Sequence, residues 1–190
     1  MQHDAIKASA SASLVSVGVG QVLEEMHAPR ARFDVVCYDK DGVEKWRDVS
    51  HNLVTTGGKN DLLDKYLSGS AYTAAWFCGL ISSVTFTAIA ATDTMATHTG
   101  WTEAGGTNAP TYTGNRPALT FAAAAGASKA TSAASSFTFT GPGTIKGMVA
   151  STVTTKDGTT GVLYNAVLFS GGDRIVANLD VVNVSVTYTA

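Results

Sequence analysis

The C-terminal residues show the clearest alternation of apolar and polar positions in the chain. Val182, Val184, Val186 and Tyr188 fall on one side, and polar residues occupy the positions between them. Successive side chains of a β-strand point to opposite faces, so this period of two predicts a strand with one buried face.

A β-hairpin is predicted over residues 32–46. Residues 32–38 are rich in β-branched and aromatic side chains, and residues 43–46 return with similar character. The intervening residues 39–42 have turn composition, and Gly42 supplies the positive φ that such a turn needs. Their two aspartates also hint at a calcium loop, but the further acidic positions of an EF-hand are missing, so a turn is expected.

Residues 57–67 are predicted to form the one helix of the chain. Its apolar residues recur at helical spacing: Leu62, Leu63, Tyr66 and Leu67. Thr55 or Thr56 can cap the first turn, and Ser68 with Gly69 marks the end.

The rest of the chain reads as a succession of short strands and turns. The candidate strands are residues 72–81, 84–87, 118–121, 136–140, 145–153 and 162–169. Residues 92–117 show no clear period and are expected to form a looser stretch. Many short strands at this spacing indicate a β-sandwich or jelly-roll-like domain. We therefore expect a mainly β fold, with residues 31–190 as a single domain.

Residues 1–30 differ from this domain and are predicted to form an extended N-terminal arm. The segment is rich in Ala, Ser and Gly and has too little bulk to build a core. We expect it to become ordered as a strand against a neighbouring protein, with an internal edge strand as the alternative. The residues expected to contact the partner are Leu14, Val15, Val17 and Val19.

Composition argues against several classes of partner. Charged residues make up 15% of the chain, against about 25% in typical soluble domains. The formal net charge is −2, and no basic cluster exceeds Arg30-Ala31-Arg32, so nucleic acid is not an expected partner. The sequence contains no apolar stretch of membrane-spanning length and no signal-peptide pattern, so no membrane partner is expected and folding is expected in a reducing cytoplasm. Small uncharged side chains suit surfaces that other protein subunits cover.

The residues that carry chemistry do not converge in the sequence. The four histidines are scattered without zinc spacing, and Gly58-Lys59 lacks the flanking residues of a phosphate loop. Asp93, His98 and Glu103 form the only local polar cluster, which is expected to be a solvated loop. We therefore predict no catalytic residue, metal, cofactor or small-molecule substrate.

Two cysteines lie far apart, each inside an apolar run. Cys37 and Cys78 are expected to be buried thiols, because free cysteine is among the most buried residue types. A disulfide is the alternative, and its geometry is not readable from the sequence.

Several motifs resemble small structural proteins of tailed bacteriophage particles. Residues 52–60, Asn-Leu-Val-Thr-Thr-Gly-Gly-Lys-Asn, running into Leu62-Leu63, are similar to an opening seen in such proteins. Residues 76–81, Trp-Phe-Cys-Gly-Leu-Ile, resemble the aromatic strand that follows it. The likeness continues through residues 93–96, His98, residues 100–103, 115–118, 163–166 and 184–188. The resemblance implies a virion component without enzymatic residues, and it leaves open which component.

The resulting expectation is a capsid decoration or cement protein of the virion. Its partners would be the major capsid protein and copies of itself, as a homo-oligomer. Trp101 and Tyr112 are candidate aromatic contact anchors for such partners, with ordinary core packing as the alternative. The competing functions are a neck, tail or fibre protein, and a host-glycan-binding module.

Overall fold

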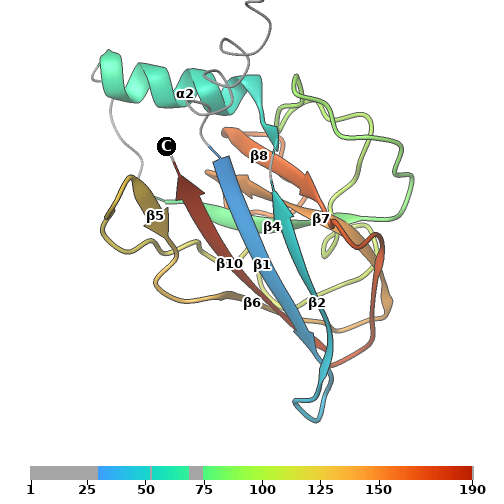
Figure 1. The fold of residues 1–190 in the computed structure, drawn as a ribbon. Helices are drawn as coiled ribbons and strands as arrows, with labels where there is room; N and C mark the ends of the chain where they lie inside the picture. Colours follow the sequence, from blue (N-terminus) through green and yellow to red (C-terminus); the bar gives the residue numbers. More distant parts are fainter. Residues whose placement is uncertain (1–29, 52, 69–74, 190) are drawn as a thin grey trace, which may run out of the picture.

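Two antiparallel β-sheets and one helix make up the part of the chain that the computed structural model describes, residues 30–51, 53–68 and 75–189 (Figure 1). One sheet has the order β2-β1-β10-β5, with β6 also paired to β10. The other has the order β3-β8-β7-β4, with β9 also paired to β7. The prediction of a mainly β, sandwich-like fold is confirmed.

The bounds of these elements follow the chain in order. They are β1 Arg30–Tyr38, β2 Glu44–His51, β3 Leu53–Val54, α2 Thr56–Leu67, β4 Phe77–Ser82, β5 Ser128–Ala130, β6 Ser135–Thr138, β7 Gly143–Ser151, β8 Leu163–Leu168, β9 Arg174–Val176 and β10 Val181–Thr189. The predicted arm, with Leu14, Val15, Val17 and Val19, lies outside the described residues.

Strands β1 and β10 build the main core from alternating residues. Phe33 pairs with Val186 and Val35 with Val184 in antiparallel register, and all four side chains are at most 1% exposed. Their apolar faces pack with buried residues of β4 and β7 in the second sheet. The period of two at the C-terminus therefore predicted the strand and its buried face correctly.

The predicted hairpin joins β1 to β2. The Asp39 carboxylate accepts hydrogen bonds from the backbone N–H groups of Asp41 and Val43, each at 2.9 Å, and Gly42 has a φ of +79°. The bond from Val43 lowers the pKa of Asp39. Local hydrogen bonding thus explains the turn without any bound ion.

The second sheet is covered on its outer face by the long loop that follows β4. Met95 and Trp101 from this loop pack against Ile81 of β4 and Val149 of β7. The strand predicted at residues 84–87 is wrong, because the chain turns there: Val84 N–H donates to Ser82 Oγ at 3.0 Å and Thr85 has a φ of +54°. Residues 118–121 likewise form isolated bridges and no strand. The short strands β5 and β9 had no counterpart in the predictions.

Both cysteines are buried and free, which confirms the expectation of core thiols. Burial raises the pKa of Cys37 and of Cys78 to about 12. In the described part of the chain, no helix is long and apolar enough to cross a bilayer.

Candidate interaction surface

The buried pair of Glu103 and Arg116 is the most enclosed charged group in the described residues. The guanidinium donates to both carboxylate oxygens at 2.6 Å, and the two side chains are 3% and 0% exposed. Arg116 also donates to Ser151 Oγ and the Val153 carbonyl, and Asp157 N–H donates to Glu103. Because neighbouring groups of the same domain engage both side chains, the pair ties β7 to the long loop and has a structural role.

A second polar network fastens β2 to the turn before β9. The Asp48 carboxylate accepts from Ser50, from Arg174 and from the backbone N–H groups of Ser170 and Gly171. Burial alone would raise the pKa of Asp48, but these hydrogen bonds outweigh it and lower the pKa. Its oxygens hold a turn in place and are not free to take a substrate.

The predicted cluster of Asp93, His98 and Glu103 does not converge. Asp93 accepts the Trp101 indole N–H at 2.9 Å, and the His98 ring stacks on Trp101 with centroids 3.8 Å apart. Glu103 points instead to Arg116. Within residues 30–51, 53–68 and 75–189, no group of His, Cys, Asp or Glu side chains has the arrangement of a metal site.

Trp101 and Tyr112 are not surface anchors in this structure. Their exposed fractions are 2% and 3%, so they offer almost no area to a partner. Trp101 lies in the core under the long loop, and Tyr112 packs edge-on against Phe137 at 5.0 Å between centroids. Both side chains pack in the core, which is the alternative that the sequence left open. Burying such large aromatic side chains removes much apolar area from water.

The helix α2 presents the largest group of exposed apolar side chains. Its first turn is anchored to β8: Thr55 Oγ1 accepts Gly58 N–H at 3.0 Å as the N-cap, and Thr55 N–H donates to the Tyr164 carbonyl of β8 at 3.1 Å. Gly58 is the one buried residue of the helix. A Cβ at this position would lie 2.3 Å from the Tyr164 oxygen, so glycine is required for this close approach.

Beyond this anchor the apolar stripe of α2 faces solvent. We call it the α2 stripe: Leu62, Leu63, Tyr66 and Leu67, exposed by 42%, 53%, 84% and 73%. A sandwich of this size buries such residues where its own core can reach them. Four large apolar side chains on neighbouring turns therefore form an apolar surface patch, and its exposure to water is energetically unfavourable.

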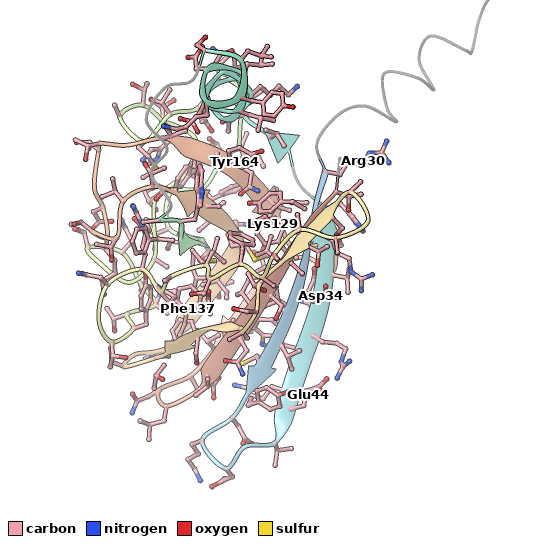
Figure 2. The ribbon with its side chains drawn as sticks, turned by 90° about the vertical axis from the view of Figure 1, so that its left-hand side faces the viewer. Arg30, Asp34, Glu44, Lys129, Phe137 and Tyr164 are labelled. Carbon is pink, nitrogen blue, oxygen red and sulfur yellow. The ribbon has the colours of Figure 1, made fainter. Side chains whose placement is uncertain are left out.

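A hollow of about 210 Å³ lies beside the stripe, between the helix and the ends of the two sheets. We call it the α2 groove; it is lined by Asp61, Leu62, Lys65, Trp76, Phe121, Lys129, Tyr164 and Tyr188. A second hollow of about 380 Å³ continues it along Trp76, Phe121 and Lys129. In Figure 2, Tyr164 lies under the helix, at the same end of the domain as Arg30 and far from Glu44.

The floor of the groove is a connected row of aromatic rings. Trp76 and Tyr164 are 5.1 Å apart between centroids, Tyr164 and Tyr188 are 5.5 Å apart, and Phe121 and Tyr188 are 5.6 Å apart. The first two contacts are edge-to-face and the third is tilted, and such contacts favour fixed ring positions. Asn165 Nδ2 donates to Tyr188 Oη at 2.9 Å, and burial raises the pKa of both tyrosines. The groove is thus a preformed, mainly apolar recess.

Three charged side chains, Asp61, Lys65 and Lys129, also line the groove. The Lys129 ammonium donates to the Ala122 carbonyl at 2.9 Å, and Asp61 and Lys65 form an i,i+4 pair at 3.8 Å. No nucleophile paired with a base lines the recess. The recess therefore combines an aromatic floor with a few charged side chains.

The sequence did not identify this site. Its aromatic residues come from four separate segments, and none shares a motif with another. The one signal in the sequence was the apolar face of the predicted helix, for which no neighbouring segment is an evident packing partner.

No known protein family matches the sequence, and a comparison with curated proteins likewise finds no match. The functional assignment therefore rests on the residues and on the geometry of this surface.

Proposed function

We propose that this chain is a structural subunit of a tailed-phage particle, acting as a decoration or cement protein on the capsid. The α2 stripe carries the proposal, because a domain that keeps four large apolar side chains 42–84% exposed is built to bind another protein. The sequence resemblance to small virion proteins supports the choice of particle.

The remaining polar side chains support binding over catalysis. Two of the enclosed carboxylates, Asp48 and Glu103, are paired with arginines that link separate segments of the fold, and a third, Asp180, is paired with Lys45. A hydrolase needs a nucleophile and a base within hydrogen-bond reach of one another in an accessible site. Neither the α2 groove nor the two buried networks offers that combination among the described residues.

The mechanism of stabilisation is mass action. A subunit that binds the assembled shell and not its separate components shifts the equilibrium toward the shell. Each contact can be weak, because many copies on a closed lattice act together. The subunit then needs a rigid recess and an apolar surface, which the aromatic floor of the groove and the α2 stripe supply.

The test is binding of purified protein to shells of its phage that lack it. Leu63→Glu and Leu67→Glu place charge on the α2 stripe, and both side chains are exposed, so the fold should be retained. We expect at least a tenfold loss of binding in each. The matched control is Ile175→Glu, on β9 and 70% exposed, which should bind as the wild type does. Equal binding by all three variants would refute the proposal.

Copy number separates decoration from the second structural candidate, a neck, tail or fibre protein. A protein gel of purified particles should contain hundreds of copies per particle for a decoration protein. A dozen or fewer would place the chain in the neck, tail or a fibre and overturn the capsid assignment.

The aromatic floor also fits the glycan-binding alternative, since sugar rings stack on aromatic side chains. Trp76 is the half-buried tryptophan of the groove. A glycan module would lose sugar binding in Trp76→Ala while Leu67→Glu kept it. We expect no sugar binding by the unchanged protein on a glycan array.

A further inference from the structure

We infer that the α2 groove receives the N-terminal segment of a second copy of this chain, with residues 14–19 seated against its aromatic floor. This inference rests on the proposed role as an assembling subunit and names the partner of the same surface. One contact between two copies would then account for both the groove and the apolar residues of the segment.

The first argument is where the segment joins the domain. Arg30 is the first residue of β1 and pairs with Thr189, next to Tyr188 of the groove. Tyr188 in turn pairs with Lys129 at the margin of the recess. The 29 preceding residues therefore start at the end of the domain that carries the groove, and copies associating through this end bring segment and groove together.

The second argument is reach. Val19 and Val15 precede Arg30 by 11 and 15 residues. At about 3.3 Å per residue, an extended chain spans roughly 36 to 50 Å between these points. A domain of this size has a radius of gyration of about 15 Å and hence a diameter of roughly 40 Å. The apolar stretch is therefore far enough from Arg30 to reach a neighbouring domain. The groove of the same chain is much closer, because Tyr188 in its floor is adjacent to Thr189, the residue that pairs with Arg30.

Pro29 also favours docking on a second copy over docking on the same domain. Proline fixes its own φ and disfavours helical backbone at the residue before it, so the sequence Ala28-Pro29 favours an extended approach to β1. Docking on the same domain would require the ten residues 20–29 to loop back over a short distance. Docking on a neighbour uses them to bridge the gap.

The third argument is complementarity. Leu14, Val15, Val17 and Val19 are aliphatic side chains, and the recess of about 210 Å³, continued by the second hollow of about 380 Å³, offers an aromatic-lined space for such side chains. The whole net charge of −2 resides in residues 1–29, which hold three acids and one base. Lys129 at the margin of the groove offers a cation to that acidic segment.

Strand addition at the β2 edge of the first sheet is a poorer alternative for the same segment. The edge strand β2 carries Glu44, Lys45, Arg47 and Asp48, and charged edge residues discourage pairing with another strand. The apolar recess is the better acceptor for an uncharged valine-rich segment.

Site-specific cross-linking of full-length chains tests the inference. Leu62→Cys places a thiol at the groove, and Val15→Cys, Val17→Cys or Val19→Cys places one in the segment. The native Cys37 and Cys78 are both 0% exposed and do not compete for a short bismaleimide linker. Mixing a groove variant with a segment variant should yield covalent dimers at least tenfold above the control pair, in which Ile175→Cys replaces Leu62→Cys.

Self-association provides the second measurement. The mass of the unchanged chain should rise with concentration in light scattering, and Leu62→Glu and Val17→Glu should each weaken association at least tenfold. Val43→Glu, at the hairpin tip with 61% exposure, should not change it.

Each other outcome would overturn the inference. Linkage within one chain in a double variant, with no dimers in the mixtures, would show that the segment docks on its own domain. Absence of any linkage with all three valine positions would show that the groove receives another protein. Shell binding is measured separately, so loss of the second-copy inference leaves the capsid proposal standing, and loss of shell binding leaves self-association standing.

Discussion

Two adjacent glycines in the first turn of α2 respond oppositely to the same substitution. A Cβ on Gly58 would lie 2.3 Å from the Tyr164 carbonyl oxygen and 2.9 Å from the Tyr164 carbonyl carbon. A Cβ on Gly57 would meet nothing closer than 3.9 Å. Gly57→Ala is therefore a matched control for Gly58→Ala.

The magnitudes follow from helix propensity and packing. Alanine is favoured over glycine by up to about 1 kcal/mol within a helix, so Gly57→Ala should raise the free energy of unfolding by that amount or less. Gly58→Ala gains the same propensity but must push the helix away from the β8 backbone. Overpacking of this kind costs about 1–3 kcal/mol, so the net effect should be a loss of roughly 1–2 kcal/mol.

Urea unfolding measures the difference between the two variants. With a slope of about 2 kcal/mol per molar urea, a separation of roughly 2 kcal/mol appears as a midpoint difference of about 1 M. Gly58→Ala should also weaken shell binding, because α2 forms one wall of the groove. Equal stabilisation by both substitutions would show that α2 does not sit on β8, and the geometry of the groove would then be wrong.

Three further results are expected. Arg116→Met leaves the Glu103 carboxylate buried without its partner and should cost about 3–5 kcal/mol of stability in chemical unfolding, whereas an enzyme residue would lower activity and leave stability nearly unchanged. The pKa of Asp48 is lower in the folded protein than in the unfolded chain, where it is about 3.9, so the ionised carboxylate stabilises the fold above that pH. This stability is lost as the pH falls through the pKa of the folded protein. Asp48→Asn should therefore flatten the acid limb of a curve of stability against pH, and an unaltered limb would contradict this. Cys37 and Cys78, with pKa values raised to about 12, should resist a thiol reagent at pH 8 in the folded protein and both react in urea; rapid labelling of the native protein would refute their burial.

Much of the local structure was readable from the sequence. The Thr55 cap and the spacing of Leu62 through Leu67 located the helix to within one residue. Residues 39–42 identified the turn, and the alternation around Val184 identified a strand with one buried face. These features follow from backbone sterics and side-chain period, which act over a few residues.

Predictions failed where tertiary contacts override local preference. The alternating residues 84–87 looked like a strand, yet the hydrogen bond from Val84 N–H to Ser82 Oγ and a positive φ at Thr85 turn the chain. Trp101 sits in a glycine-rich, loop-like stretch, and no local pattern indicates that Ile81 and Val149 enclose it.

Local elements and their polarity were readable along the chain, because a period of two indicates strands and a period of 3.6 indicates the helix. The α2 groove, in contrast, arises only from the packing of distant segments. Trp76, Phe121, Tyr164 and Tyr188 meet there because the two sheets end side by side beneath a helix anchored at Gly58. Such a meeting depends on contacts between segments more than a hundred residues apart, such as those of Trp76 and Tyr188, and no short-range pattern encodes it.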